Sequence, residues 1–225
     1  MEIFWYGQSC FLIKTKYGNI VIDPYDSEKS NTDSKLHLPK IKADVVLATH
    51  DHSGHNGIEK IAKDEKTKKP FVISGPGEYE ISGINICGLQ TSHGENSETG
   101  KSLGLNTVYS IQAEDLNLVH LGDLGELLTD EQQDKIGKVD ILFAPIGGYY
   151  TLSVKQIINL INTVEPKIVI PMHYNLDGDN QKLSGLSEFQ KEIGLTQIPK
   201  KDSLKISEKD LPSETEIIAL ECLGK

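Results

Sequence analysis

Residues 49–56 read THDHSGHN and place three of the seven histidines of the chain within six positions. The segment overlaps the end of the apolar run ADVVLAT at 43–49, which has the composition of a buried strand. His50 and His52 are two residues apart, so both imidazoles project to the same side of an extended loop. His55 lies one turn further on and can reach the far side of a cation or a second cation. We interpret the segment as a metal-binding loop at the end of a strand.

Other imidazole and acid side chains also follow apolar runs. His93 follows INICGLQTS, Asp123 follows LNLVHLG, and His173 follows KIVIPM. Because ligand sites in α/β sheets gather beyond the carboxyl ends of strands, we expect these side chains to converge on the histidine cluster. Nitrogen and oxygen ligands on rigid strand ends suit a metal that keeps one position open for water. One metal bound by three imidazoles and two metals sharing Asp123 both remain open, and either arrangement lowers the pKa of bound water.

The order of elements predicts a layered α/β fold rather than an all-β barrel, because strands dominate early and helices alternate with strands late. A Ser153/Gln156 capping box opens a helix at 153–165, and further helices are expected at 56–66 and 186–194. The strands that we expect lie at 3–6, 9–15, 19–23, 43–49, 70–74, 79–89, 106–112, 116–122, 139–146, 167–173 and 214–221.

Length and composition narrow the class of protein. No linker-like stretch divides the 225 residues, so we expect a single domain, 1–225. The net charge of −10 disfavours binding to nucleic acid, although it is compatible with a phosphate ester held by a metal. Three scattered cysteines without a C-x-x-C motif fit a reducing compartment. The start MEIFWYGQSC carries no signal-peptide pattern or membrane span, so we expect a cytoplasmic protein.

Taken together, these motifs resemble the metallo-β-lactamase superfamily. VIDP, THDHSGH, the separate His93, HLGD and PMH are similar to its successive motifs, in the same order and over nearly the whole chain. The His-x-His-x-x-His spacing is the specific part of this resemblance. The opening WYGQSCF is similar to a small, single-domain branch that includes sugar-phosphate lactonase-like proteins. The resemblance implies a four-layer αβ/βα sandwich with a metal site on one edge.

The family pattern also implies roles for individual residues. It assigns a first metal to three histidines and a second metal to two others, with one aspartate bridging both. The aspartate of the first motif supports the histidine loop from behind the ligands, since ligating imidazoles need orienting partners. In this chain these residues are His50, His52 and His93 for the first metal, His55 and His173 for the second, Asp123 as the bridge and Asp23 as the supporting acid.

Gly54 departs from the pattern that the resemblance implies. Family members usually carry an aspartate there, which binds the second metal and helps to hold the attacking water. Without that carboxylate we expect one tight metal site and a second site that is weakened or absent. Asp51 is a neighbour, but its side chain is expected to point away from that of His52.

At several positions a structural or solvent-exposed role is the alternative to metal or substrate binding. His120 lies inside an apolar strand, which favours a packed, hydrogen-bonded histidine over a ligand. His37 is expected at the surface. Lys101 could meet an anionic substrate, but such lysines are usually only solvated. Tyr174, next to His173, could donate a hydrogen bond to an oxyanion or serve in aromatic packing.

We therefore expect a metal-dependent hydrolase of an ester-like bond in a small-molecule substrate, and the resemblance to the lactonase-like branch implies a lactone or a phosphodiester. Metal-bound hydroxide attacks, and Asp123 positions the nucleophile. Zinc is the expected metal, with manganese, iron or nickel as alternatives. A non-enzymatic metal-binding protein derived from such a hydrolase remains the alternative function. A di-iron redox centre ranks last, because the family resemblance implies a glutamate within the histidine motif for such a centre and this motif contains none. The sequence leaves the oligomeric state open.

Overall fold

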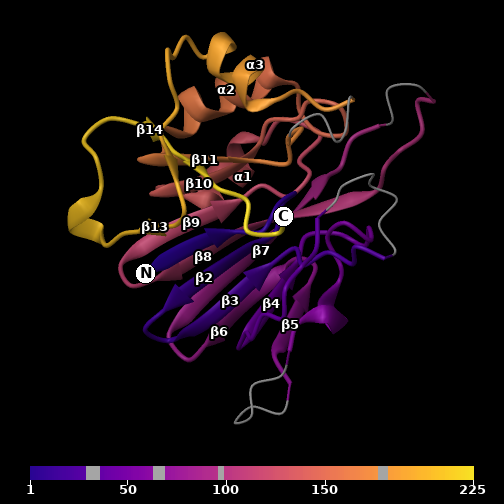
Figure 1. The fold of residues 1–225 in the computed structure, drawn as a ribbon, viewed down its shortest axis with the longest axis vertical. Helices are drawn as coiled ribbons and strands as arrows, with labels where there is room; N and C mark the ends of the chain where they lie inside the picture. Colours follow the sequence, from indigo (N-terminus) through magenta and orange to yellow (C-terminus); the bar gives the residue numbers. More distant parts are fainter. Residues whose placement is uncertain (29–35, 63–68, 96–98, 177–181) are drawn as a thin grey trace.

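The computed structural model describes residues 1–28, 36–62, 69–95, 99–176 and 182–225. Two mixed β-sheets form the framework (Figure 1). The first sheet has the strand order β13-β1-β2-β3-β4-β5, and the second has the order β14-β11-β10-β9-β8-β7-β6. The strands of the first sheet are β1 (Glu2–Trp5), β2 (Phe11–Thr15), β3 (Gly18–Ile22), β4 (Val45–Ala48), β5 (Phe71–Ser74) and β13 (Leu204–Lys205).

The second sheet combines an antiparallel half with a parallel half. Strands β6 to β9 pair antiparallel, whereas β9, β10, β11 and β14 pair parallel. Its strands are β6 (Gly77–Ile81), β7 (Ile84–Ser92), β8 (Leu105–Ala113), β9 (Leu116–His120), β10 (Ile141–Pro145), β11 (Ile168–Met172) and β14 (Glu216–Ile217).

One apolar core lies between the sheets. Phe11 of the first sheet meets Phe143 of the second, with ring centroids 4.5 Å apart, and both are fully buried. Alternating apolar side chains supply this inner face, as in β7, where Ile84 and Ile86 are buried and Asn85 is exposed. Burying each large apolar side chain contributes about 1.5–3 kcal/mol, so this shared core holds the two sheets together.

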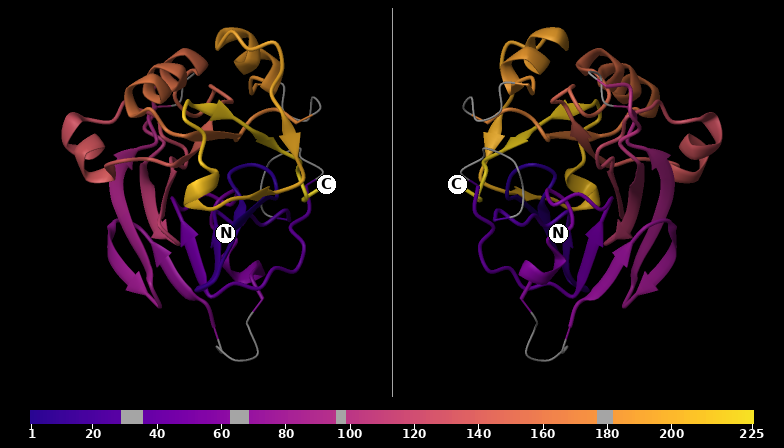
Figure 2. Two further views of the ribbon diagram at one scale, coloured as in Figure 1. Left: turned by 90° about the vertical axis from the view of Figure 1, so that its left-hand side faces the viewer. Right: turned by 90° about the vertical axis from the view of Figure 1, so that its right-hand side faces the viewer.

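The α-helices lie on the outer side of the second sheet (Figure 2). They are α1 (Asp130–Ile136), α2 (Val154–Val164) and α3 (Leu186–Glu192). The predicted capping box of α2 is confirmed, since the Ser153 hydroxyl and the Gln156 side chain each accept from the other's backbone N–H. Helix α1 was not expected from the sequence, because only Ile136 of its seven residues is buried and no apolar period marks it.

The outer face of the first sheet differs from the expected helical cover. A second apolar cluster, including Leu12, Val21 and Val46, is covered by the segment around Leu36 and Ile41. The helix predicted at 56–66 is wrong as stated. The structure has only a short 3-10 helix, η1 (Ile58–Lys60), and residues 63–66 lie outside the described residues.

Two further differences concern the last strand and a predicted long one. The strand predicted at 214–221 is divided at Ile218: β14 joins the second sheet, whereas β15 (Ala219–Leu220) pairs with β12 (Lys200–Lys201). The strand predicted at 79–89 is a hairpin of β6 and β7. The other predicted strands and α3 agree with the structure to within a few residues, so the α/β sandwich is confirmed, whereas the two-residue strands β12 and β13 were not predicted. Within the described residues, no helix is long and apolar enough to cross a membrane.

Candidate metal centre

Within each sheet, strands that run in the same direction end at the residues of one rim of the sandwich. In the first sheet, β3 ends before Asp23 and β4 ends before the histidine segment. In the second sheet, β7 precedes His93, β9 precedes Asp123, and β11 precedes His173. Strand β1 ends before Gln8. The Thr107 N–H donates to the Thr49 carbonyl over 2.8 Å and links the two sheets at this rim.

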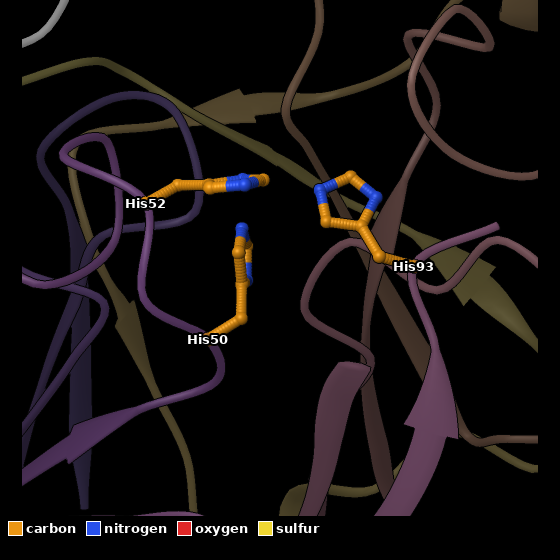
Figure 3. A group of neighbouring side chains, drawn as sticks. All are labelled: His50, His52 and His93. Carbon is orange, nitrogen blue, oxygen red and sulfur yellow. The ribbon is translucent and has the colours of Figure 1, made fainter. Parts of the chain in front are cut away.

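His50, His52 and His93 form the first group of donors (Figure 3). Their ring centroids are 4.6 Å, 4.7 Å and 5.1 Å apart, and one nitrogen of each lies within 4.8 Å of the others. His50 and His52 come from one loop, while His93 faces them from the opposite sheet. The structure thus brings together the three residues predicted to hold the first metal.

The Asp123 carboxylate lies at the centre of the other candidates. Its Oδ2 is 3.3 Å from Nε2 of His55, 3.4 Å from Nε2 of His93 and 3.4 Å from Nε2 of His173. Nε2 of His50 lies 3.9 Å from the same oxygen. One acid oxygen therefore stands between the first group of imidazoles and the pair assigned to a second metal, where a bridging ligand has to be.

Asp23 supports the histidines from behind. Its Oδ2 lies 2.8 Å from Nδ1 of His55, and its two oxygens accept the Thr49 N–H over 2.7 Å and the Thr49 hydroxyl over 2.8 Å. Asp23 is fully buried. Since the buried carboxylate accepts from Nδ1, Nε2 of His55 can present a lone pair to the Asp123 side of the site once its proton is lost. This geometry matches the supporting role that the resemblance implied.

Thr49 fixes the tautomer of His50 in the same way. The Thr49 hydroxyl has one hydrogen, which it donates to Asp23, so its 3.0 Å contact with Nδ1 of His50 requires the imidazole to donate. Nε2 of His50 is then unprotonated and faces the site. Asp23 thereby orients two histidines, one directly and one through Thr49.

The charges at this rim suit a cation. Burial, reinforced by His55, holds the pKa of His50 far below its usual value, and burial also lowers the pKa of His93 and of His173. Burial alone would lower the pKa of His55, but the carboxylates of Asp123 and Asp23 raise it to about 10. Burial alone would raise the pKa of Asp123, whereas the surrounding imidazoles, led by His173 and His55, hold it well below its usual value.

Both the residue types and the buried atoms that lack hydrogen-bond partners are consistent with metal binding. Among the described residues, Nε2 of His50 and Oδ1 of Asp123 are buried without a hydrogen-bond partner. Buried polar atoms are normally paired, so two unpaired buried acceptors on residues of one cluster fit a site for a cation. Imidazole nitrogen with carboxylate oxygen is a donor set for zinc, manganese, iron or nickel.

Backbone strain accompanies two of these positions. Asp23 and His173 have φ values of 47° and 49°, in the left-handed region that side chains other than glycine rarely adopt. The His173 N–H donates to the Gln8 carbonyl over 3.0 Å, which holds this conformation. The chain therefore retains an unfavourable backbone geometry where it positions the site.

Gln8 is the residue of this region that the sequence analysis missed. A β-carbon added at Gly54 would stand 2.8 Å from Oε1 of Gln8, so the amide of Gln8 occupies the space that a side chain at 54 would take. No spacing in the sequence links the two positions. Asp51 does not take that place, because its Oδ1 accepts from Nδ2 of Asn56 over 2.6 Å on the exposed side of the loop.

The remaining candidates have structural roles or lie at the surface. Nε2 of His120 contacts the Ser9 carbonyl at 3.0 Å, and its Nδ1 accepts the Gly122 N–H over 3.1 Å, so both nitrogens are used within the core. His37 and Lys101 are exposed. Tyr174 stacks on Trp5 with ring centroids 5.1 Å apart, which agrees with the aromatic packing role.

Comparison with known proteins agrees with this geometry. A family model described as the Beta-lactamase superfamily domain matches residues 2–173. A UPF0173 protein of Pyrococcus abyssi is 32% identical over 209 residues, which cover 85% of this chain and 91% of that protein. A UPF0173 metal-dependent hydrolase of Thermoplasma acidophilum is 29% identical over 193 residues, which cover 78% of this chain and 84% of the relative.

A solved structure from Thermotoga maritima is also similar over the full length. It is described as a candidate Zn-dependent hydrolase of the metallo-β-lactamase superfamily, and it has 29% identity and a TM-score of 0.77 with 98% of each chain covered. The chain therefore belongs to the metallo-β-lactamase superfamily. Within that superfamily, the names of its relatives support a metal-dependent hydrolase.

Proposed function

We propose that this protein hydrolyses an ester-like bond, a lactone or a phosphodiester, in a small-molecule substrate with the help of a bound metal. The observation that carries the proposal is the position of Asp123, whose Oδ2 lies within 3.9 Å of four imidazole nitrogens while Oδ1 is buried and unpaired. The resemblance of WYGQSCF to the lactonase-like branch supports an ester substrate of this kind.

The proposal assigns zinc as the metal, held by His50, His52 and His93 with Asp123 at its edge. Zinc held by these residues would supply a water of lowered pKa and would polarise the oxygen of the substrate. His55 and His173 complete a weaker second position. Asp123 accepts a hydrogen bond from the nucleophile and so directs it at the ester carbon or phosphorus. Asp23 and Thr49 keep the imidazoles oriented during the reaction.

A second function has one observation in its favour. The Gln8 amide stands where a side chain at position 54 would face the site, so that place offers a neutral oxygen instead of a carboxylate. A weaker second position would leave a protein that binds metal without turnover. The two functions differ in one measurable property, which is metal-dependent hydrolysis by the metal-loaded protein.

The test loads the purified protein with zinc or manganese, counts metal per chain by elemental analysis, and assays a chromogenic ester and a chromogenic phosphodiester. The hydrolase proposal predicts turnover that is lost in His52→Ala. His37→Ala is the matched control, since His37 is an exposed histidine outside the site. Metal bound at full occupancy without hydrolysis of either substrate would instead support the binding protein.

A further inference from the structure

A cavity of about 590 Å³ opens beside the first group of histidines. His50 and His52 form part of its wall, so a molecule in the cavity reaches the proposed metal position directly. The rest of the wall comes from the turn after β5 and from the ends of β7 and β8, including Gly75, Leu103 and Leu105. The cavity is therefore the place where a substrate would lie.

Hydrogen bonds of a buried tyrosine, Tyr109, hold two of the segments that line the cavity in place. The hydroxyl of Tyr109 donates to the Ala48 carbonyl over 3.0 Å and accepts the Gly75 N–H over 3.0 Å. Tyr109 itself is fully buried. These bonds connect the turn after β5 to the end of β4, so the part of the wall at Gly75 is fixed relative to the strand that precedes the histidine segment.

The wall is poor in positive charge. Of the described residues that line the cavity, none is a lysine or an arginine, and Asp51 is its one carboxylate. The polar groups are uncharged hydroxyl and amide side chains such as those of Ser74, Thr107 and Asn56. Apart from the metal, this wall offers nothing to neutralise an anionic substrate, and Asp51 repels one.

Apolar surface lines the opening of the same cavity. Leu105 is 62% exposed at the start of β8, and Leu103 and Pro76 lie on the wall with it. Burying an exposed leucine beside a candidate metal site against an apolar part of a ligand lowers the free energy of binding.

We propose that the substrate is an uncharged ester or lactone with an apolar acyl part, and not a phosphodiester or another anion, with Asp51 as a residue that selects against negative charge. This inference rests on the proposed hydrolase function and narrows it to one substrate class. Asp51 acts through charge at the cavity wall, so its replacement changes the preference between substrates.

The test compares para-nitrophenyl butyrate with bis-para-nitrophenyl phosphate, each as rate enhancement over the uncatalysed reaction, using zinc-loaded protein. The expected result is a higher enhancement for the uncharged ester. Asp51→Lys changes the wall by two charges and should raise the relative kcat/KM for the phosphodiester about tenfold, mainly through KM. Glu192→Lys makes the same charge change at an exposed position of α3, away from the cavity, and should leave that ratio unchanged.

A greater enhancement for the phosphodiester in the unmodified protein would overturn the inference, as would an unchanged ratio in Asp51→Lys. Either result leaves the metal-dependent hydrolase function intact, because one substrate is still turned over. Metal-loaded protein that hydrolyses neither substrate contradicts the proposed function itself, so the two failures are distinguishable.

Discussion

Nδ1 of His55 lies 2.8 Å from Oδ2 of Asp23, a residue 32 positions earlier in the chain. The contact joins the end of β3 to the loop after β4, and these two strands pair in parallel. Because the same carboxylate also accepts two hydrogen bonds from Thr49, its charge is used to orient the imidazoles and not to bind the metal. The relationship predicts that Asp23 controls metal affinity from behind the ligands.

Asp23→Asn should weaken metal binding by about tenfold to a hundredfold, because the amide has one acceptor oxygen instead of two and cannot accept all three hydrogen bonds from His55 and Thr49. Asparagine tolerates the left-handed backbone at this position, so the change removes charge without adding backbone strain. Competition with a chromophoric chelator measures the affinity. Asp44→Asn is the matched control, since the Asp44 carboxylate accepts the Asn19 N–H away from the site. Equal affinities for both variants would contradict the orienting role.

His120→Ala should destabilise the fold without changing the number of metal ions bound. The side chain is fully buried and both ring nitrogens have partners, so its loss leaves a cavity and an unpaired Ser9 carbonyl. The expected loss in free energy of unfolding is about 2–4 kcal/mol, measured by urea denaturation. Metal stoichiometry, measured on the folded variant, separates this structural role from a ligand role: a fall in bound metal would make His120 a ligand.

Gly54→Asp should tighten metal binding at the second position about tenfold or more, because it adds a negative charge next to His55. The new side chain has to displace only the flexible end of Gln8, so the fold is expected to tolerate it. Gly54→Asn is the control, with the same size and no charge. Combining Gly54→Asp with Gln8→Ala should tighten binding further, since the Gln8 amide would no longer overlap with the new side chain. Identical affinity for the Asp and Asn variants would show that position 54 does not face the second metal.

The metal-free protein should lose stability as the pH falls below about 6.5, the usual pKa of histidine. The folded state holds the pKa of His50, His93 and His173 below that value, so in this range the unfolded chain binds protons that the folded chain does not. Each such histidine adds a slope of up to about 1.4 kcal/mol per pH unit.

His55 has the opposite sign. Its pKa is raised to about 10, so the stability it contributes is complete below about pH 6.5 and is lost as the pH rises towards 10. Urea denaturation of chelator-treated protein across this range should show greatest stability near the ordinary pKa of histidine. His93→Asn should reduce the acid-side slope by about one proton. A flat profile on the acid side of the maximum would contradict the burial of neutral imidazoles.

Local pattern was enough to predict most of the framework. Helix α2 carries a complete capping box and an apolar period, and the strands of both sheets are apolar runs between turns. Helix α1 lacks such a period because it packs through one buried residue. The segment after Asn56 has helical spacing but forms only the short 3-10 helix η1, where Gly57 packs tightly against the Tyr25 backbone. The order and spacing of the histidines likewise predicted which side chains come together at the rim, and their roles as metal ligands remain predictions.

The sequence alone determined most of the strands, helix α2 and the candidate donor residues, because these depend on residue type and on distances of a few positions. Only the tertiary structure placed Asp123 between four imidazoles, set Asp23 behind His55 and brought Gln8 over Gly54. Those contacts join residues on different strands, and they depend on which strands run in parallel and on how the two sheets face each other across the core. No local pattern encodes that arrangement, because it follows from burying the apolar faces of all the strands together.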